Sequence, residues 1–186
     1  MTFHTTPSSG EPVDVILLGA GAIGSELLVQ IGWGAMVSPL RICALIDRSG
    51  YLFDPEGLSR RHLLQAVAQK SAGGKLASMN DGHVATAAEA LATIATHPLS
   101  RPVLVDATAA DTTALLEASL ARGWDVVLAN KIPLAGSQAS ADHLADVARV
   151  HGRQILHEAT VGAGLPVIDT VRKLLQTGDR ITRIEG

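Results

Sequence analysis

The sequence of 186 residues contains one cysteine, Cys43. A lone thiol cannot form a disulfide within the chain and offers no second sulfur ligand for zinc, so the sequence indicates neither an oxidising compartment nor a zinc site. No stretch approaches about 18 uninterrupted apolar residues, and the polar residues 1–11 lack the charged and then apolar layout of a signal peptide. We therefore expect a cytoplasmic protein without a membrane partner, and we interpret residues 1–11 as a disordered leader.

Basic residues are not gathered anywhere in the sequence. Lysine and arginine form no run longer than the pair Arg60 and Arg61, and the formal net charge is -3. This balance excludes the strong basic footprint of a nucleic-acid-binding surface, so we expect no nucleic acid partner. Hydrophobic residues make up 47% of the chain. That share is enough to bury the core of one globular domain, with or without a fragment of a second.

Short aliphatic runs alternate with segments of helical periodicity along most of the chain. This alternation predicts an α/β fold, a doubly wound parallel sheet of Rossmann type with helices on both faces. Residues 49–78 fit the pattern poorly and predict an irregular excursion, apart from a helix over residues 59–71. We expect strands over residues 13–18, 40–46, 103–106, 125–128, 154–157 and 181–184, and the other helices over residues 25–31, 87–96, 111–122, 137–151 and 166–177.

Gly19, Gly21 and Gly24 form a GxGxxG motif that follows the first expected strand and opens the first expected helix. In this context Gly19 permits a tight turn, Gly21 lets the backbone approach a pyrophosphate, and Gly24 allows close packing of helix on strand. The helix start adds unpaired N–H groups and a positive dipole end. A glycine-rich turn without a ligand is the alternative, but the surrounding strand and helix favour dinucleotide binding.

Asp47 ends the second expected strand, 23 residues after Gly24. A carboxylate at this place can accept hydrogen bonds from the adenosine ribose and repel a 2′-phosphate, which favours NAD. Its neighbour Arg48 can instead pair with a 2′-phosphate through its forked guanidinium, which favours NADP, or it is a solvated loop residue. The sequence therefore leaves the choice between NAD and NADP open.

Thr108 and Ala109 follow the third expected strand, and Lys131 follows the fourth. The carboxyl ends of parallel strands form the edge where doubly wound folds bind their ligands. Thr108 can offer its hydroxyl and backbone N–H to a cofactor, or its segment merely caps a helix. Lys131 can contact the nicotinamide ribose or an anionic substrate group, or it is an ordinary surface lysine.

Residues 157–166 combine Glu158 with a glycine-rich turn and end at Pro166, which starts the next expected helix. This order brings several backbone carbonyls near one carboxylate. Hard monovalent or divalent cations prefer such oxygen cages. A tight loop without a cation is the alternative.

Together these segments resemble the amino-terminal half of homoserine dehydrogenase. The glycine loop occurs in many oxidoreductases, whereas the NK-x-P and EATVGAGLP elements together are specific to this family. The resemblance is carried by GAGAIGSELL (residues 19–28), VDATA (105–109), VVLANKIPLA (126–135), HEATVGAGLPVIDTVRKLLQTGD (157–179) and RITRIEG (180–186).

The family reduces L-aspartate 4-semialdehyde to L-homoserine, reversibly, with NADPH or NADH, on the branch leading to threonine and methionine. The resemblance implies that Ala22 and Ile23 lie against the cofactor and that Thr108 and Lys131 contact it. It further implies a homodimer when the chain is full length.

The resemblance also implies a sodium ion near Glu158, with carbonyl ligands from Val161, Ala163 and Leu165. On the same ground, residues 12–165 form the NAD(P)-binding domain and residues 166–186 start the substrate and dimerisation domain. We expect the family's substrate-binding acids and proton-donating lysine beyond Gly186, so this chain is predicted to bind cofactor without completing the reaction. Two alternatives are another semialdehyde or amino-acid dehydrogenase and a non-catalytic nucleotide-sensing module.

Overall fold

The computed structural model describes residues 11–32, 40–162 and 164–185. Within them, six strands form one sheet in the order β3-β2-β1-β4-β5-β6. All neighbours pair in parallel except β2 and β3, which are antiparallel. The strands are β1 (Val13–Leu18), β2 (Leu40–Asp47), β3 (Gly50–Phe53), β4 (Val103–Asp106), β5 (Asp125–Leu128) and β6 (Ile155–Leu156).

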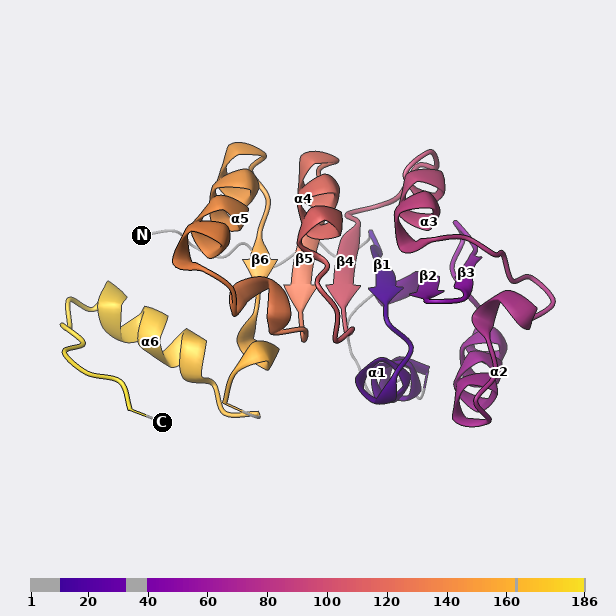
Figure 1. The fold of residues 1–186 in the computed structure, drawn as a ribbon, viewed down its shortest axis with the longest axis horizontal. Coiled ribbons are helices and arrows are strands. Elements are labelled where there is room, and N and C mark those ends of the chain that lie inside the picture. The colour runs from indigo at the N-terminus through magenta and orange to yellow at the C-terminus, as the bar shows by residue number, and fades with distance from the viewer. Residues whose placement is uncertain (1–10, 33–39, 163, 186) are drawn as a thin grey trace.

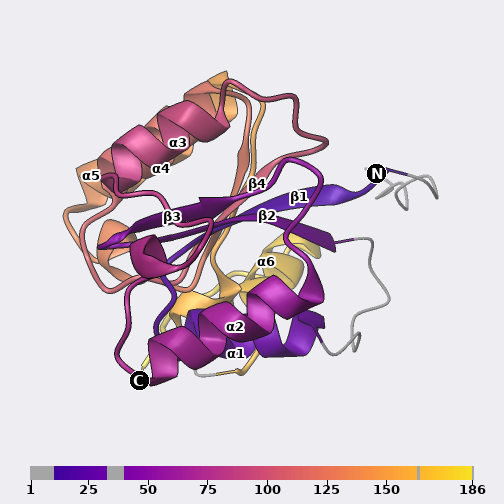
Figure 2. The same cartoon turned by 90° about the vertical axis from the view of Figure 1, so that its right-hand side faces the viewer.

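Helices cover both faces of this sheet. Figure 2 shows α3, α4 and α5 on one face, and α1, α2 and α6 on the other. The α-helices are α1 (Ala22–Gly32), α2 (Arg60–Ser71), α3 (Ala87–Ile94), α4 (Thr113–Ala121), α5 (Gln138–Val150) and α6 (Val167–Gln176), and the short 3-10 helices are η1 (Leu76–Ser78), η2 (Ile132–Leu134) and η3 (Glu158–Thr160). The expected doubly wound α/β fold of Rossmann type is thus confirmed.

The core divides into two layers because successive strand residues face opposite sides of a sheet. In β1, Ile16 and Leu18 belong to the buried cluster under α3, α4 and α5. Val15 and Leu17 belong to the cluster under α1 and α2. Both faces of β1 are therefore buried, which explains why its sequence is an almost continuous aliphatic run.

Two sequence expectations about the sheet are wrong. Residues 50–53 form the antiparallel edge strand β3, where an irregular excursion is predicted, because Tyr51 and Leu52 bury their side chains against the sheet. Residues 181–184 form no strand. They follow α6, which Figure 1 shows standing apart from the sheet, so this segment has no neighbouring strand with which to pair.

Most other expected elements are present, with shifts at their ends. The first helix begins at Ala22 rather than at residue 25, so it starts directly in the glycine loop. The strand expected over residues 154–157 is confined to residues 155–156. Of the expected leader over residues 1–11, only Glu11 lies among the described residues. None of the helices in the described ranges is long and apolar enough to cross a membrane.

Candidate cofactor-binding site

The glycine loop joins the end of β1 to the start of α1, and its three glycines have different surroundings. Gly19 has a φ of 101°, and a Cβ there would lie 2.8 Å from the carbonyl carbon of Ala107. A Cβ at Gly24 would overlap the carbonyl oxygen of Gly19. By contrast, a Cβ at Gly21 would meet no atom of the described residues within 4 Å. The fold itself therefore requires Gly19 and Gly24, whereas the space above Gly21 is open.

Ala22 and Ile23 form the first turn of α1 directly beside this open space. The first N–H groups of an α-helix have no partner within the helix, and the helix dipole places positive charge there. The side chain of Ile23 is 59% exposed although it is large and apolar. This end of α1 thus combines anion-binding N–H groups with an uncovered apolar surface.

Asp47 lies at the carboxyl end of β2, and both its carboxylate oxygens accept hydrogen bonds within the chain. Oδ1 accepts from the backbone N of Ser49 at 2.7 Å and from its Oγ at 2.6 Å. Oδ2 accepts from Nζ of Lys70 at 2.6 Å. Burial alone would raise the pKa of Asp47, but the hydrogen bonds from Lys70 and Ser49 outweigh it and hold the pKa below its usual value. Asp47 is therefore ionised, and the positive charge of Lys70 balances its negative charge.

A pocket of about 590 Å³ opens beside this carboxylate. Three basic side chains line it, those of Arg48, Lys70 and Lys75, together with Ser49. Val84 also lines the pocket, and it is 87% exposed. The pocket thus has an excess of positive charge and one uncovered apolar side chain.

Thr108 and Ala109 lie in the loop after β4, next to the glycine loop. The backbone N of Ala107 donates to the carbonyl of Leu18 at 2.8 Å, which ties the two loops together. A Cβ at Gly19 would come within 3.0 Å of Cγ2 of Thr108, so the Thr108 side chain packs directly over the turn. Ala109 is exposed.

Beneath Thr108, a buried polar cluster joins the loop after β4 to the turn after β5. Asp106 is fully buried, and its carboxylate accepts from the backbone N of Thr108 at 2.9 Å, from Oγ1 of Thr112 at 2.5 Å and from Nδ2 of Asn130 at 3.0 Å. Asn130 is itself 2% exposed. Asn130, the last member of this cluster, directly precedes Lys131 in the chain.

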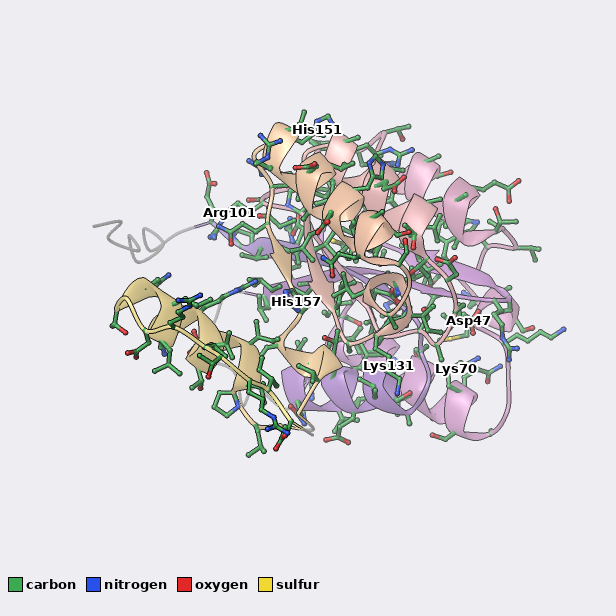
Figure 3. All side chains as sticks on the ribbon, turned by 60° about the vertical axis from the view of Figure 1, so that its left-hand side comes forward. Asp47, Lys70, Arg101, Lys131, His151 and His157 are labelled. Carbon is green, nitrogen blue, oxygen red and sulfur yellow. The ribbon has the colours of Figure 1, made fainter. Side chains whose placement is uncertain are left out.

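Lys131 is exposed and stands at the N-cap position of η2, where its backbone carbonyl accepts from the N of Leu134 at 3.1 Å. Its side-chain ammonium makes no hydrogen bond or ion pair with the residues the structure describes. Figure 3 shows Asp47, Lys70 and Lys131 toward the end of the sheet where the parallel strands finish, and Arg101 and His151 toward the opposite end. The structure therefore places the predicted residues Gly19 to Gly24, Asp47, Arg48, Thr108, Ala109 and Lys131 at one edge.

The loop predicted to hold sodium starts at η3, and its carboxylate already has partners. Oε1 of Glu158 accepts from the backbone N of Ile168 at 3.0 Å, and Oε2 accepts from that of Asp169 at 2.9 Å, so Glu158 caps α6. The carbonyl of Leu165 accepts from the N of Val167 at 2.8 Å. Val161 follows η3 directly, and Ala163 lies outside the described residues. The donor set is all oxygen, as a hard cation requires, but two of its members also serve the start of α6.

Sequence reasoning did not assign Lys70, Asp106 or Asn130 to the site. Lys70 lies in α2, 23 residues after Asp47, which ends β2. No local sequence pattern signals a pairing between residues so far apart in the chain. Asn130 follows the end of β5 by two residues, and a polar residue at that place is the available sequence signal for it. The charged Lys131 beside it is the more obvious candidate for a ligand contact.

These features define a class of protein, an NAD(P)-binding domain of Rossmann type. A glycine turn opens a helix at the carboxyl edge of a largely parallel sheet, next to a strand-ending acid and two polar loops. A family model described as "Homoserine dehydrogenase, NAD binding domain" matches residues 19–158. The chain therefore belongs to the homoserine dehydrogenase family, as its resemblance predicts.

Individual relatives support the same assignment. The chain is 31% identical over 183 residues to a bifunctional aspartokinase/homoserine dehydrogenase of Haemophilus influenzae, covering 94% of this chain and 21% of the relative. It is 31% identical over 186 residues to a homoserine dehydrogenase of Schizosaccharomyces pombe, covering 94% of this chain and 46% of the relative. The chain thus spans only part of the length of these relatives.

Solved structures have the same fold. A hyperthermophilic archaeal homoserine dehydrogenase in complex with NADPH superposes with a TM-score of 0.72 at 27% identity, over 89% of this chain and 50% of the other. A homoserine dehydrogenase from Thermoplasma acidophilum superposes with a TM-score of 0.68 at 19% identity, over 90% of this chain and 49% of the other. The second likeness concerns the fold alone.

Proposed function

We propose that this chain holds NAD(P)H along the carboxyl edge of its sheet, with the pyrophosphate over Gly21 and the first turn of α1. The observation that carries the proposal is the contrast within the glycine motif, since Gly21 is the one glycine of the three whose space the protein leaves open. Ala22 and Ile23 supply N–H groups to the pyrophosphate there. A backbone without a Cβ lets the phosphates approach these groups closely.

We propose further that NADPH binds more tightly than NADH. A free carboxylate at the end of β2 would repel a 2′-phosphate, but Asp47 is neutralised by Lys70 at 2.6 Å. Arg48 and Lys75 line the same pocket and add positive charge. The hydroxyl of Ser49 adds a neutral polar group beside them. The positive charge of this pocket favours the dianionic 2′-phosphate of NADPH over the 2′-hydroxyl of NADH.

At the other end of the cofactor, we propose that Thr108, Ala109 and Lys131 contact the nicotinamide ribose. The three residues follow β4 and β5; β4 pairs with β1 on the side away from Asp47, and β5 is the next strand beyond it. Lys131 supplies a positive charge that also suits an anionic substrate group. The nicotinamide, when bound, supplies the hydride, and these residues hold and orient it.

For the reaction, we propose reduction of L-aspartate 4-semialdehyde to L-homoserine by the complete enzyme. The family membership of residues 19–158 supports this assignment. A general acid must protonate the alkoxide that forms, and we expect that group, with the substrate-binding residues, in sequence beyond Gly186. Residues 166–186 then begin the second domain, and the homodimer and cytoplasmic location predicted from the sequence stay predictions.

A sodium ion held by Glu158, Val161, Ala163 and Leu165 is likewise a proposal. Its support is the all-oxygen donor set and the glycine-rich loop between the ligands. Because Glu158 also caps α6, we expect sodium to raise the melting temperature of the chain more than potassium does at equal ionic strength. Equal melting temperatures in the two salts would argue against the ion.

The experiment that tests cofactor binding is a titration of the purified chain with NADPH and with NADH, followed by the fluorescence of the bound nicotinamide. Gly21→Val is expected to weaken binding by about tenfold or more, because the new side chain occupies the pyrophosphate position. Its folding should be unaffected, since a Cβ there meets nothing within 4 Å.

Gly32→Ala is the matched control. Gly32 lies at the opposite end of the same helix, and a Cβ there would likewise meet none of the described residues within 4 Å. Unchanged affinity in Gly21→Val, or an equal loss in Gly32→Ala, would count against the proposed binding mode. Turnover of aspartate semialdehyde by the complete enzyme then separates a homoserine dehydrogenase from other semialdehyde dehydrogenases.

A further inference from the structure

Asn130 ties together the two loops that carry Thr108 and Lys131. Its Nδ2 lies 2.8 Å from the carbonyl of Ala110, 3.0 Å from Oδ2 of Asp106 and 3.1 Å from Oγ1 of Thr108. Its Oδ1 accepts from the backbone N of Ile132 at 3.1 Å. One buried amide thus bonds the loop after β4 with its donor end and the turn after β5 with its acceptor end.

The orientation of this amide is fixed by its two backbone partners. The carbonyl of Ala110 can only accept and the N–H of Ile132 can only donate, so Nδ2 of Asn130 faces Ala110 and Asp106, and Oδ1 faces Ile132. Asp106 has no basic partner among the described residues, and its hydrogen bonds come from Thr108, Thr112 and Asn130. The cluster therefore contains no cation that compensates the carboxylate.

The same contacts orient the groups on either side. Oγ1 of Thr108 faces Nδ2 of Asn130 as an acceptor, which leaves the hydroxyl proton of Thr108 free to donate elsewhere. Lys131 follows Asn130 directly, and the bond from Ile132 to Oδ1 fixes the backbone on its other side. A displaced Asn130 would therefore move both residues at once.

We propose that Asn130 is a positioning residue for the nicotinamide half of the cofactor, acting through Thr108 and Lys131. This inference rests on the binding mode proposed above and extends it to a residue that touches no cofactor itself. A positioning role predicts that loss of Asn130 weakens binding of the nicotinamide half and spares the adenosine half, whereas a purely structural role predicts no such difference. The adenosine half is held at Asp47 and its pocket, on β2 and α2, which make no hydrogen bond with Asn130.

The test compares two ligands on one variant, Asn130→Ala. NADPH spans the whole edge, whereas adenosine 2′,5′-bisphosphate occupies only the adenosine end. We expect Asn130→Ala to weaken NADPH by about tenfold and to reduce the fluorescence enhancement of its nicotinamide, while the affinity for the bisphosphate stays within about twofold. If Asn130→Ala does not fold, Thr112→Val removes a neighbouring hydroxyl of the cluster at nearly constant volume, and it should give the same pattern with a smaller effect.

Asp14→Asn is the matched control for lost stability. Like Asn130, Asp14 is a buried polar residue that ties separate segments together, but its partners are Arg41 and Ser100, away from Thr108 and Lys131. We expect it to lower the melting temperature without altering the affinity of either ligand.

The outcomes separate the two proposals. Equal weakening of both ligands by Asn130→Ala, or of neither, overturns the positioning role while the binding mode stands. A folded wild-type chain that binds the bisphosphate but not NADPH overturns the positioning role and the assignment of Thr108 and Lys131. A wild-type chain that binds neither overturns the proposed function and this inference with it.

Discussion

The chain buries two aspartates at opposite ends of its sheet, and they are satisfied in opposite ways. Asp14, near the start of β1, receives two hydrogen bonds from the guanidinium of Arg41, at 2.6 Å and 3.0 Å, and a third from the N of Ser100 at 2.7 Å. Asp106, at the end of β4, receives only neutral donors within the described chain. Asp14 thus has a cationic partner, whereas the cluster around Asp106 contains no cation among the described residues.

This difference distinguishes a structural end of the sheet from the end where we propose that the cofactor binds. The Arg41–Asp14 pair joins β2 to β1, and its hydrogen bond raises the pKa of Arg41 above its ordinary value. At the carboxyl end, Lys131 stays exposed next to the buried Asn130. Basic groups that the fold does not use for its own pairing are available to an anionic cofactor.

The largest effect that we expect concerns Cys43, which lies in β2 beside the Arg41–Asp14 pair. Burial, with the nearby Asp14 charge, raises the pKa of its thiol from 9.0 to about 12. At pH 8 the thiolate fraction is then about a thousandfold lower than for an unperturbed thiol, and only the thiolate is reactive. Labelling with an aromatic disulfide reagent at pH 8 should be at least that much slower in the folded chain than in urea. Rapid labelling of the native chain would contradict this account of the amino end.

The next effect concerns the buried pair itself. Asp14→Ala leaves the partly buried Arg41 with only the exposed Glu56 at 3.9 Å and the N of Ser100 without this acceptor, so the free energy of unfolding should fall by about 3 kcal/mol. Urea denaturation measures the loss. Faster labelling of Cys43 should accompany it, whereas the NADPH affinity of the folded fraction should not change. A loss of affinity would show that the two ends of the sheet are not independent.

At the carboxyl end, Lys70→Ala should change cofactor choice rather than stability. Removing the Nζ that lies 2.6 Å from Asp47 frees the carboxylate, which then repels a 2′-phosphate and accepts from a ribose hydroxyl. We expect NADPH to bind about tenfold more weakly and NADH to bind equally or more tightly.

Parallel titrations with the two cofactors measure this ratio. Arg61→Ala is the control because Arg61 is an exposed cation at the opposite end of α2. An unchanged ratio in Lys70→Ala would remove the argument for NADPH.

The smallest effect belongs to the amino end again. Arg101 has a φ of 47° directly before Pro102, a backbone conformation that suits glycine. Arg101→Gly relieves this strain, but it also increases the entropy of the unfolded chain, so the net gain in stability should be below about 1 kcal/mol. Thermal unfolding should show a small rise, with cofactor affinity unchanged. A clear fall would mean that the Arg101 side chain stabilises the turn.

Local patterns predicted the parts of the site that a few consecutive residues create. The GxGxxG spacing predicted the tight turn at Gly19 and the open position at Gly21, whereas the helix begins three residues earlier than its apolar periodicity suggested. Asp47 was correctly expected at the end of a strand. Its ion pair with Lys70 was not expected, because that contact depends on how α2 packs against the sheet.

The errors in the sheet have the same origin. Residues 181–184 begin and end with isoleucine and were expected to form a strand, yet pairing requires a strand edge nearby, and Figure 1 shows the segment after α6 away from the sheet. Residues 50–53 lack a strong local signal, yet they pair with β2 through a tight connection from Asp47 to Gly50. Whether a segment becomes a strand depended in both cases on its neighbours in space.

Glu158 gives the chain one more property. Its polar contacts with α6 fall on the first turn of that helix, where its carboxylate accepts from Ile168 and Asp169. None of the residues of α6 is buried, so packing does little to set the direction of the helix. Two hydrogen bonds from the first turn of α6 to Glu158, with the contact between Arg172 and His157 at 3.2 Å, therefore hold α6 to the segment that follows β6.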